Sequence, residues 1–208
     1  MAMTIALNKA GKRFNRDWIF RNLSCRFESG NSYAIIGANG SGKSTFLQVI
    51  AGALHLNEGS CSWTAGKPVP PEKIYRHIGC CAPYLELIEE MTLLEFLDFH
   101  QQFKPFIAGF TTKKIIAELG LQAAAHKRIQ QFSSGMKQRV KLAQCIYSDT
   151  PVVLLDEPCT NLDRQGIDLY YTLIEQYCKD RLVLVGSNDE VEYQFCREKL
   201  SMMDYKLF

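Results

Sequence analysis

The chain has 208 residues, of which 47% are hydrophobic and 22% are charged, as in folded globular proteins rather than disordered ones. Its 24 basic and 22 acidic residues leave a net charge of +2, so the composition gives no indication of a nucleic-acid-binding surface. No apolar run approaches the roughly 20 residues that span a bilayer, and the N-terminus lacks the pattern of a signal peptide. We therefore expect a cytoplasmic protein that binds no nucleic acid.

The N-terminal third is predicted to be rich in β-structure. Short strands are expected at 4–7 and 23–27, and the apolar run at 32–36 is suited to a buried strand. Phe14 and Trp18 lie upstream of this run, and either ring could stack on a purine. The alternative is core packing, which we favour for Trp18.

The stretch that follows, G-A-N-G-S-G-K-S-T at 37–45, matches the phosphate-binding pattern G-x-x-x-x-G-K-[ST]. Its glycines permit backbone angles at which successive N–H groups curl around phosphate oxygens, and a helix is expected from Thr45 onward with its N-terminus at the phosphates. The lysine would reach the β- and γ-phosphates of ATP, and the Ser44 hydroxyl would bind Mg²⁺. The alternative is a glycine-rich turn without a ligand. The predicted nucleotide-binding residues are Asn39, Gly40, Ser41, Gly42, Lys43, Ser44 and Thr45.

The middle of the chain begins with a helix that ends at Gly52, followed by a strand at 61–63 and a loop with three prolines at 68–71. A buried strand is expected at 78–82, where Pro83 stops it. Thr92 and Glu95 have the spacing of a capping box before an amphipathic helix. A second helix at 113–119 is ended by Gly120. A helical subdomain over about 84–135 is therefore predicted inside an α/β core.

Residues 132–136, with small side chains at 133–135, open a helix at 137–146. Such a helix start can attract an anion, although an ordinary N-cap is the better interpretation. Val152 to Leu155 then form a buried strand that ends in Asp156 and Glu157, where open α/β sheets bind ligands. Asp156 can hold Mg²⁺ through water and Glu157 can orient or deprotonate a water, unless both are solvated acids in a turn.

The C-terminal part contains a tight loop at 161–163 and a further buried strand at 181–186, which ends at Ser187, Asn188 and Asp189. The last fifteen residues are interpreted as a strand-like tail. The eight cysteines form no C-x-x-C and no zinc-ligand spacing with the four histidines, so we expect small, buried, reduced thiols.

The order of these motifs resembles the ATP-binding subunit of ABC transporters over essentially the whole chain, and more distantly the haem-exporter-type ATPases of cytochrome c biogenesis. Residues 37–44 resemble the family's Walker A loop, and Phe132 to Arg139 its signature, usually L-S-G-G-Q-x-Q-R. Residues 152–157 resemble Walker B with the catalytic glutamate, and 161–163 the D-loop. The resemblance implies a single ABC ATP-binding domain over 1–208: an α/β P-loop NTPase with an antiparallel β subdomain and an inserted helical subdomain.

The resemblance also implies head-to-tail pairing with a second ATPase subunit, in a homodimer or a heterodimer. Ser133 and Gly135 would then meet the γ-phosphate across the dimer, Asp163 would belong to the D-loop at the site, and Phe14 would stack on adenine. Cycles of closure and reopening would energise a separate transmembrane permease, which would hold the chain on the inner face of the cell membrane.

Two departures from the family pattern concern hydrolysis. The position of the family's Q-loop glutamine is occupied by Pro83, and that of its switch histidine by Asn188, which can hydrogen-bond a phosphate but cannot carry a proton charge. The signature has Ser134 in place of its first glycine and Met136 in place of its first glutamine. We expect intact ATP binding and slow hydrolysis that depends on Glu157. The alternatives are a soluble ABC-type ATPase uncoupled from transport, and a nucleotide-dependent switch or scaffold with little hydrolysis.

Overall fold

The computed structural model describes residues 2–206, which fall into two compact units. The first unit contains the chain up to Ile78, residues 151–156 and the chain from Asp180 onward. The second contains residues 79–150 and 157–179.

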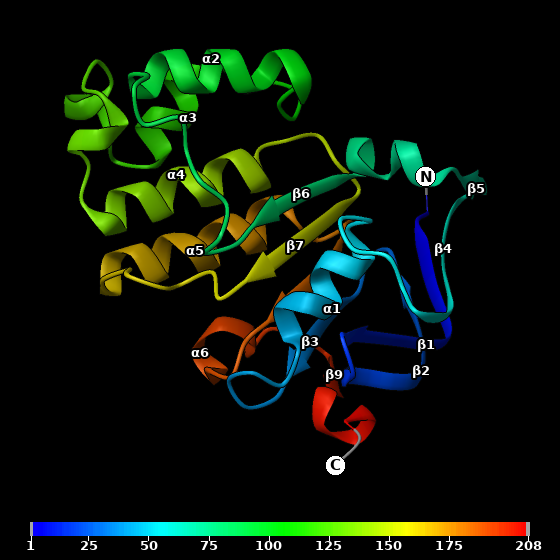
Figure 1. Ribbon diagram of the computed structural model, residues 1–208. Coiled ribbons are helices and arrows are strands. Elements are labelled where there is room, and N and C mark those ends of the chain that lie inside the picture. Colours follow the sequence, from blue (N-terminus) through cyan, green and yellow to red (C-terminus); the bar gives the residue numbers. More distant parts are fainter. Residues whose placement is uncertain (1, 207–208) are drawn as a thin grey trace. The chain divides into compact units, whose positions relative to one another are not determined.

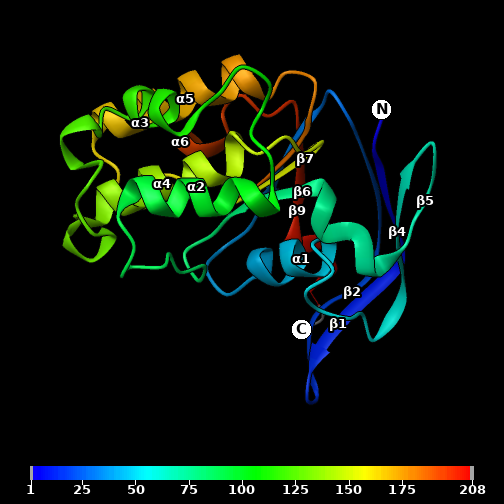
Figure 2. The same ribbon diagram turned by 90° about the horizontal axis from the view of Figure 1, so that it is seen from above.

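An antiparallel sheet in the order β2-β1-β4-β5 forms one part of the first unit (Figure 2). Its strands are β1 (Thr4–Phe14), β2 (Asp17–Glu28), β4 (Glu58–Ala65) and β5 (Lys67–Val69). Ile5 pairs with Phe27 on one side and with Trp63 on the other, and all three side chains are buried. One face of this sheet therefore contributes to the core, as alternation along antiparallel strands allows.

The predicted strands in this region are parts of longer strands: 4–7 begins β1, 23–27 lies near the end of β2, and 61–63 lies within β4. The predicted proline-rich loop at 68–71 is wrong, because Pro68 lies in β5 and Pro71 begins a 3₁₀ helix, η1 (Pro71–His77). A proline is tolerated in a short edge strand, since one face of that strand needs no N–H donor, and at the first position of a helix, where the N–H has no partner in any case.

A parallel sheet forms the other part of the first unit, with strands in the order β7-β8-β3-β9 (Figure 1). They are β7 (Val152–Asp156), β8 (Leu182–Gly186), β3 (Ser32–Ile36) and β9 (Glu198–Ser201). All residues of β7 and β8 are buried, as their continuous apolar sequences predict. The helix α1 (Lys43–Ile50) packs against β7 and β8.

The predicted strand-like tail is in fact β9, a strand paired in register with β3, followed by the 3₁₀ helix η4 (Met202–Tyr205). A short helix, α6 (Glu190–Tyr193), lies between β8 and β9 in the sequence. The coexistence of a parallel sheet with helices and a separate antiparallel sheet confirms the predicted α/β fold class.

The second unit is mainly helical. It contains most of β6 (Ile78–Cys81) and the helices α2 (Leu93–Phe103), α3 (Thr112–Glu118), α4 (Ser134–Ile146) and α5 (Arg164–Tyr177), with short 3₁₀ turns at Gln122–Ala124 and Ile129–Gln131. The capping box is confirmed, because Thr92 and Glu95 exchange both hydrogen bonds at the start of α2. The helix α4 begins at Ser134 instead of residue 137, since Ser133 caps it by accepting from the Met136 N–H.

An aromatic cluster around the buried Tyr147 links three helices of the second unit. The hydroxyls of Tyr147 and Tyr177 both donate to one carboxylate oxygen of Glu118, at 2.5 and 2.8 Å, and Phe110 packs against both rings. Burial, reinforced by the Glu118 carboxylate, raises the pKa of Tyr177 to about 12. Both phenols therefore remain protonated donors at neutral pH.

All eight cysteines are free thiols, four of them buried and four half-buried. Burial raises the pKa of Cys25 and of Cys196 to about 12 and that of Cys61 to about 11, so these thiols are protonated and unreactive at neutral pH. Within residues 2–206, no group of three or more His, Cys, Asp or Glu side chains is arranged to hold a metal ion. No helix in the same range is long and apolar enough to cross a membrane.

Candidate functional site

The phosphate loop joins β3 to α1 in the first unit, and its glycines have positive φ angles of 151° at Gly37, 76° at Gly40 and 101° at Gly42. A Cβ atom at Gly42 would lie 2.4 Å from the Ile19 side chain, and one at Gly37 would lie 2.5 Å from the Ser41 hydroxyl. The loop can therefore adopt this shape only with glycine at these two positions.

Lys43 folds back over this loop. Its side chain is only 5% exposed, and its ammonium donates to the backbone carbonyls of Gly37 at 2.8 Å and Ala38 at 3.3 Å. The Ser41 hydroxyl beside it is also buried and has no hydrogen-bond partner among the described residues. A buried ammonium next to an unsatisfied hydroxyl fits a ligand that brings its own oxygen acceptors.

The start of α1 adds further N–H donors. Gly42 occupies the N-cap position and makes no side-chain cap, so the first N–H groups of the helix are left for another acceptor. Ser44 lies in this first turn and is half-buried. Its hydroxyl is a hard oxygen ligand of the kind that Mg²⁺ prefers.

Asp156 ends β7 within the same unit and is 2% exposed. A Cβ atom at Gly186 on β8 would lie 2.8 Å from Leu47 of α1 and 3.1 Å from an Asp156 carboxylate oxygen. This close approach places the carboxylate beside α1. One carboxylate and one hydroxyl are enough for Mg²⁺, which usually keeps several waters and takes its other ligands from phosphates.

Asn188 follows β8, and its side-chain amide donates to the Asn39 side-chain oxygen at 3.2 Å. The residue predicted to replace the switch histidine therefore contacts the phosphate loop directly. Nothing in the sequence near Asn39 indicates this contact, because the two residues are 149 positions apart.

Phe14 lies at the end of β1, in the hairpin that leads to β2. Its ring is 45% exposed, and the Lys12 ammonium lies 5.0 Å from the ring centroid. An exposed ring in this position is available for stacking on a base. Trp18, for which core packing is favoured, is half-buried, and the guanidinium groups of Arg21, at 4.5 Å, and Arg13, at 5.4 Å, contact its ring.

The remaining predicted residues belong to the second unit. Ser133 is the N-cap of α4, and Gly135 lies in its first turn, where a Cβ atom would be 2.9 Å from the Asn161 carbonyl oxygen. Asp163 is the N-cap of α5 and accepts from the Gly166 N–H. That hydrogen bond, together with the Arg139 guanidinium, holds the pKa of Asp163 below its usual range.

Glu157 has a φ angle of +45° and is half-buried. A left-handed conformation at a residue other than glycine costs on the order of 1 to 3 kcal/mol and is typical of functional sites. The sequence indicates Glu157 as a functional residue but not this conformation. The helix α5 was not predicted, although Asp163 as an N-cap and the apolar spacing after it indicate that helix.

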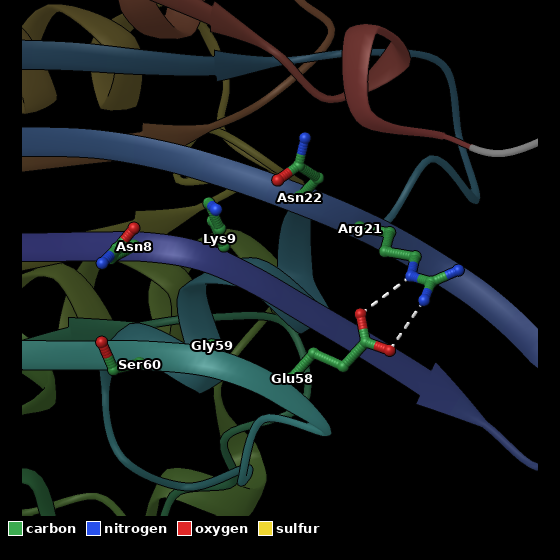
Figure 3. Close-up of a pocket in the computed structure, with 7 residues that line it drawn as sticks. All are labelled: Asn8, Lys9, Arg21, Asn22, Glu58, Gly59 and Ser60. Carbon is green, nitrogen blue, oxygen red and sulfur yellow. Dashed lines mark hydrogen bonds and ion pairs between the residues drawn. The ribbon is translucent and has the colours of Figure 1, made fainter.

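A separate open pocket of about 650 Å³ lies on the antiparallel sheet and is lined by polar side chains (Figure 3). Its main feature is a bidentate ion pair in which Arg21 donates twice to Glu58, both times at 2.8 Å. Both charges are already paired, and none of the predicted nucleotide-binding residues lines the pocket. It is therefore not part of the candidate site.

Comparison with known proteins identifies the family. The sequence pattern of the ABC transporter family matches residues 20–160. An uncharacterized ABC transporter ATP-binding protein of Bacillus subtilis, YhcH, is 29% identical over 98% of this chain and 68% of its own length. The cytochrome c biogenesis ATP-binding export protein CcmA of Haemophilus influenzae is 28% identical over 90% of each chain.

Among solved structures, the dimeric bacterial ABC transporter cassette MJ0796 superposes with a TM-score of 0.80 at 21% identity, covering 95% of this chain and 94% of that one. This likeness shows the shared fold. The phosphate loop, the carboxylate beside α1 and the family match over residues 20–160 agree with one another. The chain therefore belongs to the ABC transporter family, as one of its ATP-binding subunits.

Proposed function

We propose that this chain binds and hydrolyses ATP, and that ATP-driven pairing of two such subunits energises transport by a separate membrane permease. The observation that carries the proposal is the phosphate loop, in which a buried Lys43 ammonium and an unsatisfied Ser41 hydroxyl lie together at the start of α1. The proposal treats residues 1–208 as a single ABC ATP-binding domain with its helical subdomain at about 84–135.

Each residue of the first unit has a definite part in this proposal. The loop N–H groups and Lys43 would bind the β- and γ-phosphates, while Ser44 and Asp156 would hold Mg²⁺, which neutralises phosphate charge when bound. Exchange of the Gly37 and Ala38 carbonyls for phosphate oxygens would give Lys43 stronger, charge-assisted hydrogen bonds. Phe14 would stack on the adenine ring.

Glu157 is proposed to orient and deprotonate the attacking water, and Asn188 to hydrogen-bond the γ-phosphate. Position 83 has a proline in place of the family's glutamine, and position 188 has an asparagine in place of its histidine. Two of the groups that the family uses to position the water and the phosphate are therefore missing. Hydrolysis is therefore proposed to be slow, while ATP binding, which depends on the phosphate loop, is retained.

The second subunit is proposed to complete each site. Ser133 and Gly135 at the start of α4 expose N–H groups that would meet the γ-phosphate bound by the partner, and Asp163 would lie at the same interface. Relatives such as CcmA are export proteins by name, and a permease beside this subunit would hold it at the inner face of the membrane. The substrate would be selected by that permease.

Phosphate release by the purified protein, with its permease in liposomes, tests the proposal. We expect slow release from the wild type and a fall of about 100-fold in Glu157→Gln, since a general base contributes on the order of 10²- to 10⁴-fold. ATP affinity should be the same in both proteins, which controls for folding. Equal release from the wild type and Glu157→Gln would remove hydrolysis from the proposal.

A second candidate function, a nucleotide-dependent switch or scaffold with little hydrolysis, is favoured by Pro83 and Asn188. It predicts ATP-dependent dimerisation without phosphate release above the Glu157→Gln background. A soluble ATPase uncoupled from transport predicts release that is unchanged by the permease. Measuring dimerisation and phosphate release on the same samples, with and without permease, therefore separates the three functions.

A further inference from the structure

We propose that Gln138 is a positioning residue for Glu157, and that it acts by holding the carbonyl group of Pro158. This inference rests on the proposed role of Glu157 in hydrolysis. All residues that carry it belong to the second unit, on α4 and on the loop at 157–163, which is called the glutamate loop below.

The contact itself is short and shielded from water. The Gln138 side-chain amide donates to the Pro158 carbonyl oxygen at 2.7 Å, and Gln138 is only 5% exposed. The same amide nitrogen lies 3.6 Å from the Cys81 sulfur, a weak acceptor. Because a buried polar group cannot turn to water instead, loss of this hydrogen bond leaves the Pro158 carbonyl with a poor replacement.

The glutamate loop needs such support. Glu157 has a φ of +45°, which a side-chain-bearing residue adopts only when its surroundings hold it there. Within the loop, the N–H of Thr160 donates to the Glu157 carbonyl at 3.2 Å, and that of Leu162 to the Cys159 carbonyl at 3.0 Å. These local turns close the loop on itself but do not fix its position against the rest of the unit.

Two further contacts from α4 reach the far end of the loop. Gly135 comes so close to the Asn161 carbonyl that a Cβ atom there would lie at 2.9 Å, and Arg139 pairs with Asp163 at 3.0 Å. Asp163 is largely exposed, so water weakens that ion pair, whereas the Gln138 contact is buried. Gln138 therefore gives the loop a buried attachment to α4, at the residue directly next to Glu157.

The consequence is a link within one subunit between the signature region at the start of α4 and the carboxylate that acts on water. A shift of α4 when the signature meets nucleotide would be passed to Glu157 through Pro158. Gln138 touches neither the substrate nor the water, so its removal should change the rate of hydrolysis and leave nucleotide affinity unchanged.

Three variants of the full chain test this role. Gln138→Leu and Gln138→Met both remove the donor, and methionine also keeps the length of the glutamine side chain. Both should lower kcat for phosphate release about tenfold, the usual effect of one lost hydrogen bond, with ATP affinity within about twofold of the wild type. The matched control is Gln144→Leu, the same change about 9 Å further along α4, which should leave kcat unchanged.

Two results would show that Gln138 merely packs. One is a loss in Gln138→Leu that Gln138→Met, which has the length of glutamine but no donor, does not share. The other is a parallel loss of kcat and ATP affinity in both variants. In addition, Gln138→Leu in the Glu157→Gln background should cause no further loss if the two residues act as one unit, while an independent role would add its full effect.

Amide hydrogen exchange of the nucleotide-free protein provides a readout that does not depend on hydrolysis. Gln138→Leu should speed exchange at Thr160 and Leu162 about tenfold relative to the wild type, with little change elsewhere in the second unit. Unchanged exchange at these two amides would overturn the inference even if the wild type proved inactive. Conversely, an inactive wild type with faster exchange in the variant would count against the proposed hydrolysis and not against this link.

Discussion

The phosphate loop at 37–45 and the glutamate loop at 157–163 both depend on left-handed backbone, but they obtain it differently. The first uses glycines at 37, 40 and 42, for which positive φ angles carry little steric cost. The second uses Glu157 and Asn161, at φ angles of 45° and 64°, and is held by contacts from α4. The phosphate loop's own residues therefore determine its shape. The shape of the glutamate loop depends on residues about 20 positions away in the sequence.

This difference agrees with the proposal that ATP binding is retained while hydrolysis is slow. In that proposal, binding depends on one continuous stretch whose glycines, lysine and helix start are all present. Hydrolysis would depend on groups from several segments, and Pro83 and Asn188 occupy two of those positions. A change at one distant contact of the glutamate loop should then alter hydrolysis and leave nucleotide binding intact.

The largest expected effect is a loss of ATP affinity through a change in the phosphate loop. Lys43→Ala removes the buried ammonium and should weaken ATP binding by about 100-fold, since a hydrogen bond to a charged group contributes about 1.5 to 3 kcal/mol. Titration of the protein with ATP by calorimetry measures this loss. The exposed Lys67→Ala is the matched control and should bind as the wild type does; equal affinity in Lys43→Ala would contradict the assignment of the loop.

The next effect compares two glycines of the phosphate loop. Gly42→Ala should lower the free energy of unfolding by about 3 kcal/mol, because the added methyl meets Ile19 at 2.4 Å in addition to its unfavourable φ. Gly40→Ala has the φ penalty alone, with no atom within 4 Å of the new methyl, and should cost about 1 kcal/mol. Urea unfolding of the nucleotide-free proteins measures both, and equal losses would show that the Ile19 contact relaxes freely.

The same contrast explains what the sequence could predict. The phosphate loop, the buried strands around it and the capping box at Thr92 are local patterns, and the structure contains the elements they indicate. The bonds from Gln138 to Pro158 and from Asn188 to Asn39 join segments 20 and 149 positions apart, and no local pattern encodes them. A strand-like tail was predicted, but its pairing with β3 as the edge strand β9 was not, since tertiary neighbours determine that pairing.

A smaller effect is expected at Asn188, which contacts the phosphate loop and is also proposed to act in hydrolysis. Asn188→Ala removes the amide that donates to Asn39 and should slow phosphate release about three- to tenfold with little change in ATP affinity. Asn188→His should make the ratio of variant to wild-type rates depend on pH, with a midpoint near the usual histidine pKa of about 6.5. A ratio that stays constant from pH 6 to 8 would show that this side chain does not act on the phosphate.

The smallest expected effect is a pH-dependent loss of stability in the second unit, which depends on His100. His100 on α2 lies between Phe96 and Phe106, and its Nε2 atom is 2.9 Å from the Ser148 hydroxyl oxygen. The Ser148 hydroxyl also donates to the Gln144 carbonyl at 2.5 Å. Burial, with a smaller contribution from the Lys104 ammonium, lowers the pKa of His100 to about 4.

Because the folded pKa of His100 is lower than the unfolded value of about 6.5, the unfolded state binds more protons between these two values. Its contribution to stability is complete above pH 6.5 and is lost as the pH falls towards 4. At pH 5 we expect a loss of about 1 kcal/mol relative to pH 7, because partial solvent access reduces the full effect. Urea unfolding at the two pH values should show this loss in the wild type and in His126→Gln, an exposed control, but not in His100→Gln.

Because the lost stability belongs to the helical unit, amide exchange in α2 should speed up at pH 5, after correction for intrinsic rates, before exchange in α1 does. Faster exchange in α1 first would mean that the phosphate loop is the weaker of the two regions.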